Sequence, residues 1–321
     1  MTGNTFYFNW EVSLMEFLQG FIGPFGISLA KAFTFLGSSV ALIAVVGTCY
    51  LGINKKIGLK IGINTLVGAV SNCMIKNIFN RRRPYFDNSG IKCLVPVDSK
   101  YDIYDLAAQG WSFPSGHSGN AAAICASIAS AVKKKYAYII AAIATFGVGF
   151  SRVIVGCHYP TDVICGWVQG LLTVLIVQAL YDKIDKKKLY LILVCFLSIG
   201  FAYCKSNDFY QTYGITIGFL ASNLFDEKYV DFKNTKNFIK MLVRVAFSAG
   251  VFFGCSSLLK MPFSSELLNS ATMTAYLIRA IRYAISTFVG FGLCPMLYKY
   301  NILKLDDEKR WLYEVNPQSW T

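Results

Sequence analysis

The sequence predicts an all-α protein of the polytopic membrane class, a helix bundle with about nine transmembrane helices. The first observation is composition, since 55% of the 321 residues are apolar and 15% are charged, against about 25% charged in soluble domains. The second is arrangement, because the apolar residues gather into runs separated by short basic stretches, and the mean hydropathy is +0.45. An ordinary soluble globule is therefore excluded, and the abundance of Phe and Tyr excludes a disordered chain.

Nine apolar segments approach the roughly 20 residues that a helix needs to cross the hydrocarbon core. These predicted spans are residues 37–53, 58–79, 116–132, 137–155, 161–181, 189–204, 211–225, 239–259 and 274–298. Eight or ten spans are the alternatives, because several segments are short at one end. In residues 1–36 a helical apolar pattern is interrupted by Gly20, Gly23 and Pro24. There we expect helices that lie at the membrane interface rather than a tenth span.

Basic residues are divided unequally between the two sides that nine spans define. Alternate connections, beginning with Lys55, Lys56 and Lys60, carry 19 of the 31 Lys and Arg residues, and the opposite connections and the spans share the other 12. By the positive-inside rule the first set is cytoplasmic, which places the N-terminus outside and the C-terminus in the cytoplasm. Asn-x-Ser/Thr sites are absent, which fits a bacterial plasma membrane.

Three clusters of polar residues lie at span ends on the predicted outer face. In chain order they are Lys76-x6-Arg83-Pro84, Pro114-Ser115-Gly116-His117 and Ser151-Arg152-x5-His158-x3-Asp162. Each residue taken alone has a structural explanation, such as an arginine that reaches toward lipid headgroups. Both histidines of the chain fall in these clusters, however, and ionisable groups in spans are costly and commonly mark a site. Their location on one side of the bilayer therefore indicates a functional site.

The basic residues of the clusters describe a site for an oxyanion. Lys76, Arg83 and Arg152 supply three permanent positive charges, the natural partners of phosphate oxygens. Ser115 and Gly116 add a hydroxyl group and a backbone N–H at a predicted helix N-terminus, where unpaired amides and the helix dipole attract anions. We find no His pair, Cys cluster or carboxylate loop with the spacing of metal ligands. The sequence therefore predicts phosphate binding without a metal or other cofactor.

The histidines add catalytic groups to this site. His158 and Asp162 are four residues apart, with Pro160 suited to open a helix between them. This spacing lets the carboxylate accept a hydrogen bond from one ring nitrogen and leaves the other nitrogen as a nucleophile. His117 has the pKa range needed to protonate a leaving alkoxide.

The three clusters resemble the complete signature of the type 2 phosphatidic acid phosphatase superfamily, which includes membrane lipid phosphatases, glucose-6-phosphatases and vanadium haloperoxidases. The resemblance covers about residues 58–181 and shows no departure at the signature positions. It implies that His158 attacks phosphorus to form a phosphohistidine, that Asp162 orients it and that His117 protonates the leaving group. The residues that it implies for phosphate binding are Lys76, Arg83, Ser115, Gly116, Ser151 and Arg152.

We therefore expect four parts: an interfacial segment (1–36), a catalytic membrane core (37–181), additional transmembrane helices (182–300) and a cytoplasmic tail (301–321). The nine-span layout is similar to the glucose-6-phosphatase and sphingosine-phosphate phosphatase branches. The expected partners are the lipid bilayer and a membrane lipid phosphate or diphosphate, with no nucleic acid; the oligomeric state is left open. The alternatives are hydrolysis of a soluble sugar phosphate and transfer of the phosphoryl group to another lipid. A soluble haloperoxidase does not fit the composition, and a silent scaffold does not fit the complete set of catalytic residues.

Overall fold

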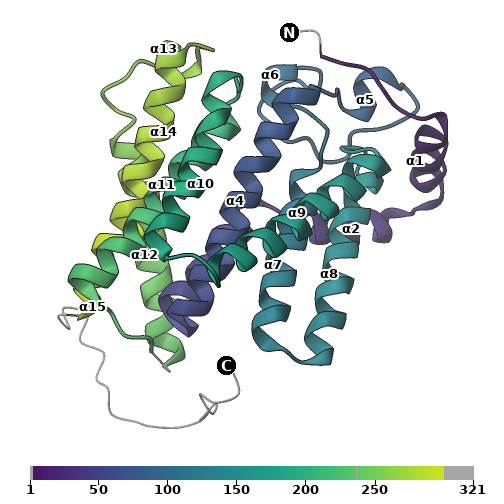
Figure 1. Cartoon of the computed structure of the whole chain (residues 1–321). Helices are drawn as coiled ribbons and strands as arrows, with labels where there is room; N and C mark the ends of the chain where they lie inside the picture. The colour runs from purple at the N-terminus through teal and green to yellow at the C-terminus, as the bar shows by residue number, and fades with distance from the viewer. Residues whose placement is uncertain (1–2, 236, 300–321) are drawn as a thin grey trace.

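A computed structural model describes residues 3–235 and 237–299 of the protein, and these residues form an all-helical bundle (Figure 1). The predicted fold class, an all-α membrane bundle, is confirmed. The longer helices are α1 (Asn9–Phe21), α2 (Pro24–Leu36), α3 (Ser39–Gly47), α4 (Lys55–Phe79), α7 (Gly116–Val132), α8 (Lys135–Ile154), α9 (Pro160–Tyr181), α10 (Lys186–Ser198), α11 (Asn207–Phe225), α12 (Phe238–Leu258) and α14 (Met273–Phe288). Shorter elements are η1 (Thr48–Ile53), α5 (Pro84–Asp87), α6 (Leu106–Gln109), η2 (Ile199–Ala202), η3 (Asp226–Val230), α13 (Ser265–Asn269), η4 (Val289–Leu293) and α15 (Cys294–Lys299).

Five helical segments are long and apolar enough to cross a membrane within the described residues. They are Lys55–Phe79, Lys135–Ile154, Pro160–Tyr181, Phe238–Leu258 and Met273–Tyr298. The other four predicted spans fall on α3 with η1, on α7, on α10 with η2 and on α11, and the count of nine stays a prediction. The predicted tail, residues 301–321, lies outside the described residues.

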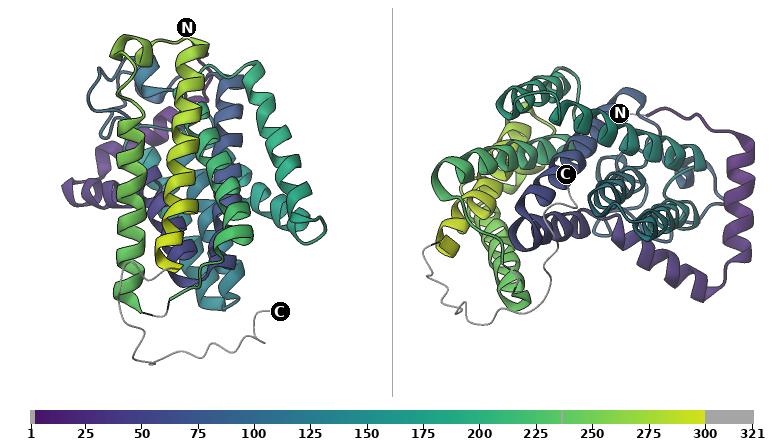
Figure 2. Two further views of the ribbon diagram at one scale, coloured as in Figure 1. Left: turned by 90° about the vertical axis from the view of Figure 1, so that its left-hand side faces the viewer. Right: turned by 60° about the horizontal axis from the view of Figure 1, so that its bottom comes forward.

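The N-terminal helices α1 and α2 form a corner at one side of the bundle, as Figure 2 shows. The break falls at Ile22 and Gly23, Pro24 opens α2, and the two helix axes differ by 120°. Proline suits the first position of a helix because its missing N–H has no partner there in any case. Helix α2 packs against α8. The location of α1 and α2 at the membrane interface stays a prediction from the sequence.

The half of the bundle that carries the predicted site consists of α4, α7, α8 and α9. Glycines let α7 and α9 approach closely, because a Cβ atom on Gly166 would lie 2.5 Å from the carbonyl oxygen of Ser115. A Cβ atom on Gly170 would lie 2.3 Å from the carbonyl oxygen of Gly119. Small residues are the usual means by which membrane helices come into close contact. This contact fixes the start of α7 beside the start of α9.

The second half of the bundle, α10 to α15, is joined to the first by α11, which packs against both α4 and α14 (Figure 1). Gly214 and Gly218 of α11 face the carbonyl oxygens of Ala280 and Ala284, at 2.2 and 2.4 Å from a built Cβ atom. On the α4 side, Phe219 packs over Gly62. Helix α11 is therefore held in close contact on two sides, which keeps the two halves in register.

Large apolar side chains point outward from α8 and α9. Ile143 is 61% exposed and Leu175 is 64% exposed. Such faces are unfavourable in water and are what a bilayer covers. The chain is an integral membrane protein.

Candidate active site

The predicted site residues come from helix ends that meet at one end of the bundle. Lys76 lies in the last turn of α4, Ser115 precedes α7, and His158 lies in the connection between α8 and α9. The remaining predicted residues are Arg83 before α5, Gly116 and His117 in the first turn of α7, Ser151 and Arg152 in the last turn of α8, and Asp162 in the first turn of α9. The fold thus brings together the three sequence clusters, whose first and last residues, Lys76 and Asp162, are 86 positions apart.

His158 and Asp162 form the pair that their spacing predicts. Nδ1 of His158 lies 3.4 Å from Oδ2 of Asp162, and both side chains are buried. The same carboxylate oxygen accepts hydrogen bonds from the backbone N–H of Tyr159, at 2.9 Å, and from the hydroxyl group of Ser112. The Ser112 hydroxyl oxygen also lies 3.3 Å from Nδ1 of His158. Asp162 is therefore held in place, and Nδ1 is the nitrogen that meets it.

The other ring nitrogen of His158 faces positive charge. Nε2 lies 3.2 Å from Nη1 of Arg83. Burial lowers the pKa of His158 well below its usual value, and the charges of Arg83, Lys76 and Arg152 lower this pKa further. Both effects disfavour the imidazolium form. His158 is therefore neutral near pH 7, with a lone pair available on Nε2 when Nδ1 carries the proton.

Arg83 and Lys76 are held by backbone carbonyl groups. Arg83 donates to the carbonyl oxygens of Gln109, Gly110, Trp111 and Cys157, at 2.8 to 3.3 Å. Nζ of Lys76 donates to the carbonyl oxygens of Trp111 and Ser112, at 2.6 and 3.1 Å. Neither side chain makes a salt bridge with a carboxylate within the described residues. Their charges are oriented but not neutralised.

Arg152 is the third cation at the site. Its side chain is buried, and Nη1 lies 3.4 Å from the hydroxyl oxygen of Thr34 on α2. Nε of Arg152 has no hydrogen-bond partner in the described part of the chain. A buried guanidinium group without a carboxylate is costly unless a ligand compensates it. Arg83 and Arg152 line one cavity, and their charges act on His158 together with that of Lys76, so this end of the bundle is suited to an anion.

The start of α7 faces the same pocket. Ser115 caps this helix, because its hydroxyl oxygen accepts a hydrogen bond from the hydroxyl group of Ser118, at 2.8 Å, and from the Ser118 N–H, at 3.4 Å. The backbone N–H of Ser115 donates to the carbonyl oxygen of Asp162, at 2.9 Å. This bond joins the starts of α7 and α9. The N–H groups of Gly116 and His117, the first two of α7, are available to an anion.

Ser151 differs from the other predicted phosphate-binding residues. Its hydroxyl group donates to the carbonyl oxygen of Val148, at 2.7 Å, and lies 2.8 Å from the hydroxyl oxygen of Thr34. Ser151 also lines an apolar cavity between α2 and α8. The structure thus places Ser151 beside the site with its hydroxyl group turned to α2, and its phosphate contact stays a prediction.

Sequence reasoning missed a second ion-pair system beside the site. Arg81 is 1% exposed and bridges two buried carboxylates, with Nη1 2.6 Å from Asp162 and Nη2 2.9 Å from Glu11. Glu11 comes from α1 and also accepts hydrogen bonds from the backbone and the hydroxyl group of Thr161, at 3.0 and 2.6 Å. Glu11, an acidic residue on the N-terminal segment with an apolar helical pattern, was the available signal. Its partner, 70 positions away, was not visible in the sequence.

Gln109 was also missed. This buried side chain organises the loop that covers the site, because its amide oxygen accepts from the N–H of Val97, at 2.8 Å, and its amide nitrogen donates to the carbonyl oxygen of Asp98, at 2.8 Å. The backbone carbonyl of Gln109 then binds Arg83.

Within residues 3–235 and 237–299, no group of three or more His, Cys, Asp or Glu side chains is placed to hold a metal ion.

Comparison with known proteins adds two family matches. The PAP2 superfamily model matches residues 57–186, and the model described as PAP2 superfamily phosphatase, transmembrane extension, matches residues 210–305. The first match contains every predicted site residue, and the second begins within α11. No solved structure matches the chain.

Three similar curated relatives are named as lipid phosphatases. Phosphatidylglycerophosphatase B of Bacillus subtilis is 41% identical over 85 residues, which are 24% of this chain and 42% of the relative. Undecaprenyl-diphosphatase of Sulfolobus acidocaldarius is 30% identical over 118 residues, 36% of this chain and 51% of the relative. Lipid A 1-phosphatase of Rhizobium johnstonii is 35% identical over 105 residues, 32% of this chain and 38% of the relative. The matched segments thus span about half of these relatives or less.

Proposed function

Because the chain belongs to the PAP2 superfamily, we propose that it is a membrane phosphatase that hydrolyses a lipid phosphate or diphosphate through a phosphohistidine intermediate. The observation that carries this proposal is the placement of Lys76, Arg83 and Arg152 near a neutral His158, with no salt bridge from these three residues to a carboxylate in the described part of the chain. A phosphoryl group supplies the missing negative charge. The names of the three relatives support a lipid substrate.

In the first step, Nε2 of His158 attacks phosphorus, a P–N bond forms and the P–O bond to the leaving group breaks. The negative charge of the bound phosphate favours the imidazolium form of His117, which donates its proton to the leaving alkoxide, so that the leaving group departs as an alcohol. Asp162 accepts the hydrogen bond from Nδ1–H and stabilises the positive charge that develops on the His158 ring. In a diphosphate, the leaving group is a phosphate monoester instead of an alcohol.

In the second step, water attacks the phosphohistidine. Neutral His117 takes a proton from this water and the P–N bond breaks. Inorganic phosphate is released, and neutral His158 and the imidazolium form of His117 are regenerated. The phosphoryl oxygens are held throughout by Lys76, Arg83 and Arg152 and by the groups of Ser115, Gly116 and Ser151. These fixed donors stabilise the charge of the transferring phosphoryl group without a metal or cofactor.

The decisive experiment measures release of inorganic phosphate by the purified protein. The panel contains phosphatidate, phosphatidylglycerophosphate, a polyprenyl diphosphate, sphingosine phosphate and glucose phosphate. We expect turnover of at least one lipid, unchanged by EDTA, and ³²P trapped on the wild-type protein but not on His158→Ala. Turnover restricted to glucose phosphate would favour a sugar phosphatase. Transfer of ³²P to an added lipid alcohol would favour a phosphotransferase. Full turnover by His158→Ala would refute the mechanism.

We further propose that the site and the N-terminus face the extracytoplasmic side of a bacterial plasma membrane and that the C-terminus is cytoplasmic. The uneven division of basic residues supports this orientation. A cysteine placed at exposed Ser89, in the loop over the site, should react with an impermeant maleimide added to intact cells. One placed at exposed Asn234 should react only after lysis. Labelling of the chain with its native cysteines alone is the control, and the opposite pattern would overturn the orientation.

A further inference from the structure

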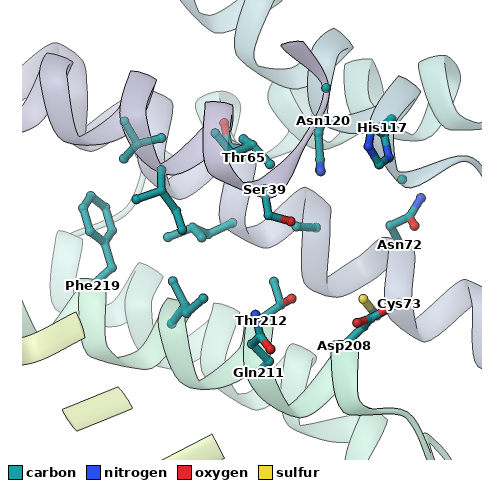
Figure 3. Close-up of a pocket in the computed structure, with 18 of the residues that line it drawn as sticks. Ser39, Thr65, Asn72, Cys73, His117, Asn120, Asp208, Gln211, Thr212 and Phe219 are labelled. Carbon is teal, nitrogen blue, oxygen red and sulfur yellow. The ribbon is translucent and has the colours of Figure 1, made fainter. Parts of the chain in front are cut away.

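A cavity of about 260 Å³ leads from the candidate site into the bundle. At one end its lining includes His117, His158, Arg83 and Arg152. It continues between the first half of the bundle, represented by α3, α4 and α7, and helix α11 of the second half. Figure 3 shows His117 and Asn120 on one wall and Gln211 and Thr212 on the other. The signature residues account for only the first of these walls.

The α11 wall is one stripe of this helix. Asp208, Gln211, Thr212, Ile215 and Phe219 line the cavity. Asp208, Gln211, Ile215 and Phe219 follow each other at intervals of three and four residues, and Thr212 lies next to Gln211. Such intervals place side chains on one face of an α-helix. The stripe changes character along its length, because its first three residues are polar and its last two are apolar.

The polar end of the stripe lies near the predicted leaving-group histidine. Figure 3 shows Asp208 and Gln211 across the cavity from Asn72 and His117. Thr65, on α4, is fully buried and lines the same cavity, and its hydroxyl oxygen has no hydrogen-bond partner in the described part of the chain. Polar groups in this arrangement are suited to a ligand that carries hydrogen-bonding groups of its own.

The other end of the cavity is apolar. Phe219 and Ile215 of α11 line this end together with Val46 and Leu66 of the first half and with Phe291, whose ring centroid lies 5.7 Å from that of Phe219. Along α4, which runs from Lys55 to Phe79, the lining extends from Cys73 near the site to Thr65 near the middle of the helix. The cavity therefore leads from a phosphate site at a helix end toward membrane depth.

We propose that the α11 stripe binds the leaving group of the substrate, which rests on the phosphatase function proposed above. The substrate class is a phosphate monoester whose alcohol carries a hydroxyl or ammonium group close to the ester oxygen, followed by a hydrocarbon chain. Asp208 and Gln211 bind the hydroxyl or ammonium group, and the chain lies along Ile215 and Phe219. A single chain fits the volume of the cavity better than a large multi-chain lipid.

The charge of Asp208 also selects against a second phosphate. A diphosphate places further negative charge on the leaving-group side of the reacting phosphorus, where Asp208 faces the cavity. Like charges in a partly enclosed site repel. A lipid monophosphate is therefore preferred to a polyprenyl diphosphate.

The chain-binding end is tested with Ile215→Trp. The matched control is Ile217→Trp, which makes the same change on the same helix at a residue outside the cavity lining. The substrates are acylglycerol phosphates with short and long acyl chains, and p-nitrophenyl phosphate, which has no chain. Ile215→Trp should lower kcat/KM about tenfold for long chains only, as overpacking of an apolar pocket implies. An equal effect on all three substrates, or an equal effect of Ile217→Trp, would overturn the proposal.

The polar end is tested with Asp208→Asn, with Glu266→Gln as the control for loss of an exposed carboxylate on the short helix that precedes α14. Removal of the charge of Asp208 relieves its repulsion of a second phosphate, and we expect a change of about tenfold, which corresponds to about 1.4 kcal/mol. Asp208→Asn should therefore raise the ratio of diphosphate to monophosphate kcat/KM about tenfold, and Glu266→Gln should leave it unchanged. An unchanged ratio in Asp208→Asn would refute the role of this carboxylate.

The two proposals fail in different ways. If wild-type protein hydrolyses neither p-nitrophenyl phosphate nor any lipid of the panel, the phosphatase function itself is wrong. If p-nitrophenyl phosphate is hydrolysed normally by all four variants but chain length and diphosphate preference do not respond, only the role of the α11 stripe is wrong.

Discussion

Replacing Arg81 with methionine is expected to destabilise the protein strongly, although Arg81 lies outside the signature of the site. Its guanidinium group bridges Asp162 and Glu11, and it donates further hydrogen bonds to Thr161, at 2.8 Å, and to the carbonyl oxygen of Phe6, at 2.7 Å. The group lies over the ring of Tyr159, 4.1 Å from its centroid. Methionine keeps much of the side-chain length and removes every one of these charged contacts.

The size of the effect follows from the burial of both carboxylates. Asp162 and Glu11 are 0% exposed, so neither gains water when Arg81 is removed. Breaking a buried ion pair by removing one partner costs about 3–5 kcal/mol, because the remaining charge is left without compensation. For a chain of this size that corresponds to a fall of roughly 4–7 °C in the unfolding midpoint. Adding Glu11→Gln to Arg81→Met should restore about 1–3 kcal/mol, since an amide is less costly to bury unpaired than a carboxylate.

The assay is thermal unfolding of the detergent-solubilised protein, followed by intrinsic fluorescence. Arg82→Met is the matched control, because the neighbouring Arg82 is 32% exposed and pairs with Asp87 near the surface; exposed pairs contribute about 0–1 kcal/mol. The reasoning is refuted if Arg81→Met unfolds within about 2 °C of the wild-type protein. It is also refuted if Arg82→Met loses as much.

Three further predictions concern the reaction and its pH dependence. Asp162→Asn should keep measurable activity while His158→Ala falls to background in phosphate-release assays, because a group that orients the nucleophile is less costly to lose than the nucleophile. His117→Ala should lose much less kcat with p-nitrophenyl phosphate than with an alkyl phosphate, since nitrophenolate needs no proton to leave; equal losses would contradict its role as the acid. The pKa of His158 is lower in the folded protein than the usual value of about 6.5. The unfolded chain therefore binds a proton at this histidine more readily than the folded protein does. His158 in consequence lowers the free energy of unfolding progressively as pH falls below about 6.5. Unfolding midpoints without phosphate should therefore fall less steeply below pH 6.5 in His158→Gln than in the wild-type protein.

Local sequence signals predicted the elements that carry the site. The predicted span 116–132 has the same bounds as α7, because a serine cap stands before it and three lysines follow its end. The predicted hydrogen bond between His158 and Asp162 is present for a similar reason, since the two residues are four positions apart beside a proline. Capping, proline and short spacing act over a few residues and can be seen in the sequence.

Contacts over long distances in the sequence could not be predicted in the same way. The pairing of Glu11 with Arg81 depends on how the corner of α1 and α2 folds back on the bundle. The polar face of α11 gave no signal as a site wall, because Asp208 and Gln211 stand in an otherwise ordinary apolar helix. Only the packing of α11 against α4 brings them opposite His117.

In the run Arg81-Arg82-Arg83, the first and third arginines have different electrostatic roles beside the site. Arg81 is neutralised by two carboxylates, whereas the partners of Arg83 among the described residues are carbonyl groups and Nε2 of His158. If Arg81 were absent, the charge of Asp162 would act directly on the nearby cations and reduce their attraction for phosphate. Because Arg81 takes up this charge, Asp162 can orient His158 while the positive field of Arg83 remains available to an anion. The buried pair is therefore expected to contribute to phosphate affinity as well as to stability.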